Sequence, residues 1–189
     1  VVGSNKIIID LPVGFTFDLS NDSGIYGDGI TNDNNVGIGN LDTSKTWEYS
    51  IDGGKTWTNG PDSSFRFDLP DGAYADGSIL IRQPHILNDY FVYEFGGIHT
   101  VDTTVSIPTF TLTNDNGVST TDGITSNGLI KLAGTGEKGA TVSIYNGNTK
   151  LGETIVKEDG TWSFNATDPL AVGIHKIGVS QVDIAGNHS

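Results

Sequence analysis

The chain has 189 residues, of which 10 are Lys or Arg and 23 are Asp or Glu, so its formal net charge is −13. Nucleic acids and anionic membranes are bound by basic surfaces, and the composition therefore argues against both as partners. No apolar run reaches the roughly 18 residues of a membrane-spanning helix, so we expect no membrane insertion. The absence of cysteine excludes disulfides, zinc-thiolate sites and cysteine nucleophiles.

Short alternating segments predict an all-β fold. The chain contains 26 glycines and many Asn-Asp-Gly clusters, and these leave no segment long or periodic enough for an amphipathic helix. Apolar and polar residues alternate over residues 45–49, 78–81, 141–145 and 173–179. Each stretch would place one apolar face on a core, as the strands of a β-sandwich require.

An internal repeat divides the chain. Residues 17–24, FDLSNDSG, match residues 110–117, FTLTNDNG, at a distance of 93 positions. Further matches follow in the same order: Asp10 with Asp102, residues 27–31 with 121–125, 46–49 with 141–144, and 83–89 with 181–187. The period is about the length of one seven-strand Greek-key sandwich, so we expect two tandem sandwiches.

The repeat also sets the expected domain boundaries. A divergent first repeat would span residues 10–101 and a second repeat residues 102–189, while residues 1–9 would be the last strand of a preceding repeat or an N-terminal extension. Residues 90–95 would form the last strand of the first repeat. The second repeat shows no counterpart after Asn187, so we expect it to lack this strand here. Residues 6–9 of a neighbouring molecule are a candidate to pair with the open edge.

A series of motifs in the second half resembles a known family. The series comprises residues 101–104 (VDTT), 114–117 (NDNG), 122–125 (DGIT), 134–139 (GTGEKG), 159–162 (DGTW) and 183–187 (DIAGN). It resembles the bacterial immunoglobulin-like (Ig-like) repeats of giant type I secreted, RTX-type adhesins and of biofilm-associated proteins. The resemblance implies two tandem immunoglobulin-like β-sandwiches in an extracellular protein of the bacterial cell surface. It further implies neighbouring repeats of the same chain as partners, a role in adhesion or biofilm formation, and Ca²⁺ at the joints between domains.

Carboxylates at one end of the second repeat suggest a Ca²⁺ site. Ca²⁺ takes six to eight oxygen ligands from carboxylates, amides and carbonyls. In a seven-strand sandwich the incoming linker and two of the turns lie at one end, which would bring together Asp102, Glu137, Asp183 and Asn187. In the first repeat Asp42 matches Glu137, but His85 replaces Asp183 and Asp89 replaces Asn187, so a Ca²⁺ site there is in doubt.

A second candidate set lies in the loops that follow the first strand of each repeat. These loops carry Asp22 and Asp28 in the first repeat and Asp115 and Asp122 in the second. They are expected at the opposite end of each sandwich, where they could meet the next linker. The alternative for every acidic loop is turn chemistry, because Asn, Asp and Gly favour tight turns without binding any ion.

Aromatic residues gather in the first repeat. Tyr90, Tyr93 and Trp57 are candidates to stack on a glycan or to contact a host or surface protein, although aromatic residues of a sandwich more often belong to its core. Trp57 and Trp162 each follow a glycine turn and are expected to occupy equivalent positions at the core edge.

The sequence contains no arrangement typical of catalysis, so we expect no enzyme. Its four histidines lack metal-ligand spacing, and no nucleophile elbow or phosphate loop occurs. Three functions remain open. They are a Ca²⁺-stiffened structural extender of an adhesin, a glycan- or protein-binding module carried by the first repeat, and an accessory domain of a secreted polysaccharide-degrading enzyme.

Overall fold

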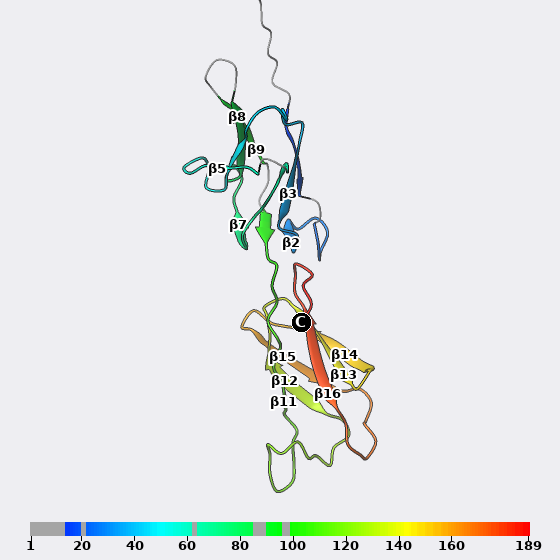
Figure 1. Cartoon of the computed structure of the whole chain (residues 1–189). Helices are drawn as coiled ribbons and strands as arrows, with labels where there is room; N and C mark the ends of the chain where they lie inside the picture. Colours follow the sequence, from blue (N-terminus) through cyan, green and yellow to red (C-terminus); the bar gives the residue numbers. More distant parts are fainter. Residues whose placement is uncertain (1–13, 20–21, 62–63, 85–89, 96–98) are drawn as a thin grey trace, which may run out of the picture. The chain divides into compact units, whose positions relative to one another are not determined.

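The computed structural model describes residues 14–19, 22–61, 64–84, 90–95 and 99–189, and these residues form β-strands, turns and loops (Figure 1). They group into two compact units. The first comprises Val1–Asn21 and Asp33–Val101, and the second comprises Asp22–Asn32 and Asp102–Ser189. No described residue belongs to a helix long and apolar enough to cross a bilayer. The predicted all-β fold with more than one sandwich is confirmed.

The first unit packs two antiparallel sheets over an apolar core. One sheet has the order β1 (Thr16–Leu19), β3 (Asn35–Gly39), β6 (Arg66–Asp68), and the other β5 (Thr58–Asn59), β4 (Glu48–Ser50), β8 (Leu80–Pro84), β9 (Tyr90–Glu94). In addition, β7 (Gly72–Tyr74) pairs with β10 (His99–Val101). Trp47, Phe67 and Ile81 are among the buried side chains between the sheets. Strand β9 pairs with β8, so residues 90–95 form the predicted strand, but β10 follows it in the same unit and β9 is not the last strand.

The second unit has the same two-sheet plan. One sheet has the order β11 (Thr111–Leu112), β12 (Lys131–Thr135), β15 (Thr161–Asn165). The other has the order β14 (Thr149–Ile155), β13 (Thr141–Asn146), β16 (Ile177–Val182). Strand β2 (Ile30–Thr31) lies in the segment grouped with this unit. Along β13 the alternation predicted from the sequence holds, because Val142 and Ile144 are fully buried while Thr141 and Ser143 are not. Burial of each such aliphatic side chain contributes about 1.5–3 kcal/mol.

The predicted strand over residues 173–179 is correct only in its second half. Strand β16 begins at Ile177, which pairs with Asn146, the last residue of β13. Strand β13 ends there, and the chain turns at Gly147, whose amide donates to the carbonyl of Lys176 at 2.8 Å. Residues 173–176 therefore have no strand to pair with, and Ile174 is fully exposed rather than inward-facing.

The free side of β16 carries only the beginning of a further strand. After a turn, His188 forms an isolated antiparallel bridge with Val182, and the amide of Ser189 donates to the carbonyl of Gln181 at 3.0 Å. Within the described residues, no strand covers the rest of this side of β16. The segment 6–9, predicted to pair with this edge, lies outside the described residues, as does Asp10.

Candidate metal centre

Three separate segments of the second unit bring carboxylates to one place. Asp102 follows the end of β10, Glu137 lies in the turn between β12 and β13, and Asp183 begins the turn after β16. Each turn is fixed by backbone hydrogen bonds, including those from Ala140 to Glu137 at 3.0 Å and from Gly186 to Asp183 at 3.3 Å. The chain thus holds side chains that are 35 to 81 positions apart in the sequence on one small surface.

The three carboxylates are close enough to share one cation. One oxygen from each of Asp102, Glu137 and Asp183 lies within 4.8 Å of the other two. Oxygens bound to the same Ca²⁺ at 2.3–2.6 Å are at most about 5 Å apart, so the spacing fits a common ion. Asp183 is only 7% exposed. None of the ion pairs found between described residues includes any of the three, so their charges oppose one another without a compensating cation.

Asn187 holds the cluster together in a different way from that expected. Its side-chain nitrogen donates to Oδ2 of Asp183 at 2.8 Å and to the carbonyl of Asp102 at 2.7 Å, and its backbone amide donates to Oδ1 of Asp183 at 2.8 Å. Asn187 therefore links the linker segment to the turn after β16. In this arrangement it positions Asp183 and presents a donor, rather than an oxygen, to the carboxylates.

Gln181 and Ser106 complete the surroundings of Glu137. The backbone amide of Glu137 donates to Oε1 of Gln181 at 3.2 Å, while Nε2 of Gln181 donates to the Ser106 carbonyl at 2.8 Å. The Ser106 amide in turn donates to Oε2 of Glu137 at 3.3 Å. No role was assigned to either residue from the sequence. The feature of the sequence that could have indicated Gln181 is the recurrence of Gln at positions 83 and 181, which the internal repeat aligns.

The electrostatics of the cluster favour a bound positive charge. Burial raises the pKa of Glu137 above its ordinary value, and the nearby carboxylates of Asp102 and Asp183 raise it further, although the hydrogen bond from Ser106 lowers it. A raised carboxyl pKa means that the ionised form is less stable here than in water. A cation placed among the three carboxylates would reverse this effect.

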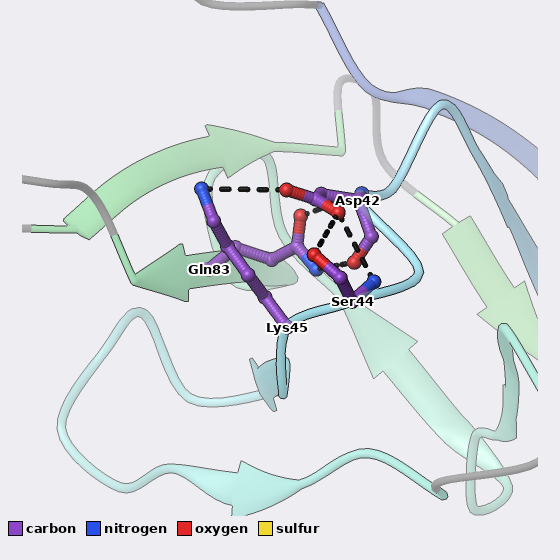
Figure 2. A network of polar contacts seen from close by, with 4 residues as sticks. All are labelled: Asp42, Ser44, Lys45 and Gln83. Carbon is purple, nitrogen blue, oxygen red and sulfur yellow. Dashed lines mark hydrogen bonds and ion pairs between the residues drawn. The ribbon is translucent and has the colours of Figure 1, made fainter.

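In the equivalent turn of the first unit, a lysine and a serine contact the carboxylate (Figure 2). The amide of Asp42 donates to Oε1 of Gln83 at 3.0 Å, which repeats the bond between Glu137 and Gln181. Lys45 lies 3.5 Å from Oδ2 of Asp42, and the amide and hydroxyl of Ser44 donate to Oδ1. These hydrogen bonds, those from Ser44 foremost, lower the pKa of Asp42. The other aligned positions, His85 and Asp89, lie outside the described residues.

The second candidate set forms no comparable cluster within the described part of the chain. Each of its four aspartates instead accepts a backbone hydrogen bond inside its own loop: Asp22 from Gly27, Asp28 from Ile30, Asp115 from Gly123 and Asp122 from Ile124. These bonds are of the kind by which aspartates stabilise tight turns, the alternative to ion binding raised by the sequence. The two loops nevertheless share one feature, because Oδ1 of Asp22 and Oδ1 of Asp115 are both buried without a hydrogen-bond partner among the described residues.

The aromatic candidates fall on two sides of their sheet. The ring of Tyr93 packs against Phe15 with a centroid distance of 4.2 Å, on the core side. Tyr90 is 43% exposed, and the guanidinium of Arg82 lies between its ring, at 4.3 Å, and that of Trp57, at 3.9 Å. Arg82 thereby covers the ring faces with a cation–π stack.

The expected equivalence of the two tryptophans is wrong. Trp162 is buried in β15, where its indole nitrogen donates to the Thr135 carbonyl at 3.1 Å. Trp57 lies outside the core in the turn before β5, and its indole nitrogen donates to the Gly54 carbonyl at 3.1 Å. A glycine turn precedes both, but Trp162 lies within strand β15, whereas Trp57 directly precedes the short edge strand β5.

Residues 101–189 match the model of the bacterial Ig-like domain family. The resemblance inferred from the sequence motifs is thus confirmed for the repeat that carries them. No curated protein matches the chain.

Solved structures with similar folds share little sequence with the chain. The BSP domain of a biofilm-associated protein is 19% identical, with 84% of this chain and 26% of that chain covered and a TM-score of 0.33. A Ca²⁺-stabilized adhesin that helps an Antarctic bacterium bind ice is 20% identical, covering 95% and 47%, with a TM-score of 0.34. Fibronectin(III)-like modules of Clostridium thermocellum CbhA are 15% identical, covering 93% and 89%, with a TM-score of 0.41. The chain thus spans about a quarter of the first of these proteins.

Proposed function

We propose that the chain is a non-enzymatic extender segment of a bacterial cell-surface adhesin, stiffened by Ca²⁺ bound to Asp102, Glu137 and Asp183. The observation that carries the proposal is the approach of three carboxylate oxygens to within 4.8 Å of one another with no ion pair to any described basic residue. The bacterial Ig-like domain found over residues 101–189 supports the structural role, because it supplies a repeat unit rather than a catalytic site.

The donor set suits Ca²⁺ better than a softer metal. All three side chains offer carboxylate oxygens, and Ca²⁺ prefers oxygen ligands in a flexible geometry, whereas zinc and copper favour nitrogen and sulfur. Three carboxylates supply between three and six of the six to eight ligands that Ca²⁺ takes, and backbone carbonyls and water would complete the shell. Asn187 would hold Asp183 in place for the ion through its two hydrogen bonds to that carboxylate.

The position of Asp102 gives the ion a mechanical role. Asp102 directly follows Val101, the last residue grouped with the first unit. A cation bound to it together with Glu137 and Asp183 would fasten the linking residue to two turns of the second unit. Without the cation, mutual repulsion of the three carboxylates would favour their separation. Ca²⁺ would therefore convert a hinge into a fixed connection.

The stiffness of the chain tests this function. Small-angle scattering of the 189-residue chain should show a larger maximum dimension and less flexibility in millimolar Ca²⁺ than in excess EDTA. Asp102→Ser keeps an oxygen that can accept from the Thr104 amide, as Oδ1 of Asp102 does at 3.2 Å, but removes the charge, and it should abolish the difference. Asp42→Asn, in the lysine-paired turn of the first unit, should leave it unchanged. Identical scattering of the wild-type chain in both buffers would contradict the proposal.

A second candidate function is a ligand-binding module in the first unit, favoured by the exposed Tyr90 beside Trp57 and Arg82. A glycan or protein would contact the outward side of this stack, which lies on the sheet formed by β5, β4, β8 and β9. A glycan array probed with the intact chain tests it, with Trp57→Ala and Tyr90→Ala as comparisons. Signals that both substitutions remove would support this function, and signals at background would dismiss it for glycans.

A further inference from the structure

One loop from the first repeat belongs to the second unit by its contacts. Residues Asp22–Asn32 precede the second repeat in the sequence, yet they group with the rest of the second unit. The hydroxyl of Ser23 donates to the Ala185 carbonyl, in the turn after β16, at 2.5 Å. Near the other end of the loop the Thr31 carbonyl accepts from the Asp102 amide at 2.9 Å. The loop therefore has separate hydrogen bonds to two of the segments that carry the acidic cluster.

Backbone packs directly on backbone where this loop meets the turn after β16. Gly24 has a φ of 72°, and a Cβ at this position would overlap the Ile184 carbonyl oxygen. Across the contact Gly186 has a φ of 89°, and a Cβ there would lie 3.1 Å from the Gly24 nitrogen, closer than side chains normally approach. Glycine suits both positions for its conformation and for its lack of a side chain. A side chain on Gly24 would therefore separate the loop from the turn.

The loop is held in shape by its own side chains. Asp22 and Asp28 each accept a backbone hydrogen bond from within it. The Ser23 hydroxyl accepts from the Asn32 amide at 2.7 Å, which brings the two ends of the loop together. The same hydroxyl donates to the turn after β16, so one side chain both closes the loop and attaches it. The two aspartates thereby shape the loop that meets the turn.

The loop contacts the segments of two of the three clustered carboxylates. Asp183 and Asn187 bracket the turn after β16, and a hydrogen bond from the Asp183 amide to the Asn187 carbonyl closes it at 3.1 Å. Ala185, which accepts the bond from the loop, lies in the middle of this turn and is 1% exposed. Asp102 is bound to the loop through its own amide. The loop thus fixes the backbone that carries two of the carboxylates, while Glu137 belongs to a different turn.

We propose that the loop of residues 22–32 positions Asp102 and Asp183 for the cation. Its positioning residues are Ser23 and Gly24. The loop holds the two segments so that their carboxylates stay close together, although these groups repel one another. Docking of the loop and binding of the cation therefore strengthen each other by the same factor. The identity of the cation as Ca²⁺ rests on the proposed function, whereas the positioning of the two segments does not.

Calorimetric Ca²⁺ titration and hydrogen exchange of the intact chain test the loop. Ser23→Ala removes the hydrogen bond to the turn, and Gly24→Ala blocks the backbone contact. Each change should weaken Ca²⁺ binding roughly tenfold, as expected for groups that orient metal ligands. In EDTA each should speed exchange at the amides of Asp102 and Asn187. Because the coupling is reciprocal, saturating Ca²⁺ should slow exchange at the Asn32 amide of the wild-type chain by about the same factor.

Two further variants separate positioning from a general loss of stability. Gly117→Ala adds a side chain at the equivalent glycine of the second repeat, which also has a positive φ, of 123°. Among the described residues no atom beyond its chain neighbours lies within 4 Å of the added Cβ. This control should keep the wild-type Ca²⁺ affinity and the wild-type exchange at Asp102 and Asn187. Ser23→Thr retains the hydroxyl and should restore most of the affinity lost in Ser23→Ala.

The outcomes distinguish this proposal from the proposed function. If the wild-type chain binds Ca²⁺, an unchanged affinity in Ser23→Ala and Gly24→Ala, or an equal loss in Gly117→Ala, would overturn the positioning role. If the wild-type chain binds no Ca²⁺, the proposed function fails and exchange in EDTA decides alone. Faster exchange at Asp102 and Asn187 in the two loop variants would then support the positioning role, and unchanged exchange would overturn it.

Discussion

The backbone amide of Glu137 donates to the side-chain oxygen of Gln181 at 3.2 Å, and this bond fixes the turn that carries the acidic cluster. The first unit repeats the bond between Asp42 and Gln83 at 3.0 Å. The two turns share this amide-to-glutamine hydrogen bond, but the groups around their carboxylates differ. Lys45 forms an ion pair with Asp42 and Ser44 donates hydrogen bonds to it, whereas Glu137 faces two further carboxylates. The same turn therefore carries a lysine-paired carboxylate in one unit and a proposed Ca²⁺ site in the other.

Replacing Gln181 by Leu should destabilise the second unit. Gln181 is 1% exposed, and the change would leave the Glu137 amide and the Ser106 carbonyl without their partner. Both groups are only partly buried, and each lost hydrogen bond costs about 0.5–1.5 kcal/mol. Hydrogen exchange under native conditions should report faster opening of β13 and β16 with unchanged protection in β4 and β8. Gln83→Leu is the matched change and should instead speed exchange in β4 and β8 while leaving β13 and β16 unchanged. Equal loss of protection in both units with either variant would contradict the role given to each glutamine.

Glu137→Gln should have opposite effects in the presence and absence of Ca²⁺. Folding raises the pKa of Glu137, so ionisation of this carboxyl group opposes folding. In EDTA the second unit should therefore lose stability as the pH rises from below the ordinary carboxyl pKa through the raised value. The Gln variant lacks this loss and should unfold at a higher temperature than the wild-type chain in EDTA at pH 7. In Ca²⁺ it should unfold at a lower temperature. Thermal unfolding in the two buffers measures both differences, and the same sign in both would count against the cluster as a cation site.

Asp52 should give the first unit the opposite pH dependence. Hydrogen bonds from the side chain and amide of Thr56 and from the side chain of Ser50 lower the pKa of Asp52 to about 2. The stability from its ionised form is present above the ordinary value near 3.8 and is lost as the pH falls through about 2. Acid unfolding followed by hydrogen exchange in β4 should show this loss, and Asp52→Asn should remove that part of the pH dependence. An unchanged acid profile in the variant would show that these bonds do not stabilise the turn.

Asn187→Ala should weaken Ca²⁺ binding without removing a carboxylate. Asn187 positions Asp183 through two hydrogen bonds and ties it to the Asp102 carbonyl. Groups that orient metal ligands change affinity by about 10- to 100-fold when they are removed. Calorimetric titration with Ca²⁺ measures the change. Asn114→Ala, which alters an amide in the loop that carries Asp115, is the control and should retain the wild-type affinity.

The sequence predicts much of the fold because its signals are local and occur twice. Alternation identified β13, and the repeat identified β9 as a strand, although not that β10 follows it in the same unit. The extent of β16 was predicted incorrectly, because it depends on where β13 turns at Gly147, a tertiary feature. The different places of Trp57 and Trp162 also depend on which strand follows each turn.

The candidate site was only partly predictable. Topology suggests that the linker and the two turns meet at one end, and the structure places Asp102, Glu137 and Asp183 together there. The role of Asn187 as a donor, the clamp by Gln181 and the pairing of Asp42 with Lys45 depend on side-chain orientation, which spacing along the chain does not determine.

The calcium dependence of thermal unfolding tests the central claim most directly. The intact chain, Asp183→Asn and Asp42→Asn would be heated in millimolar CaCl₂ and in EDTA with NaCl at matched ionic strength, because monovalent salt screens charges but does not coordinate. The account predicts that Ca²⁺ raises the unfolding temperature of the second unit in the wild-type chain and in Asp42→Asn, by about 2.7 kcal/mol in free energy at 100 times the dissociation constant. Asp183→Asn should lose this rise. Equal unfolding temperatures with and without Ca²⁺ in the wild-type chain would contradict the account and leave the acidic residues as turn-forming groups.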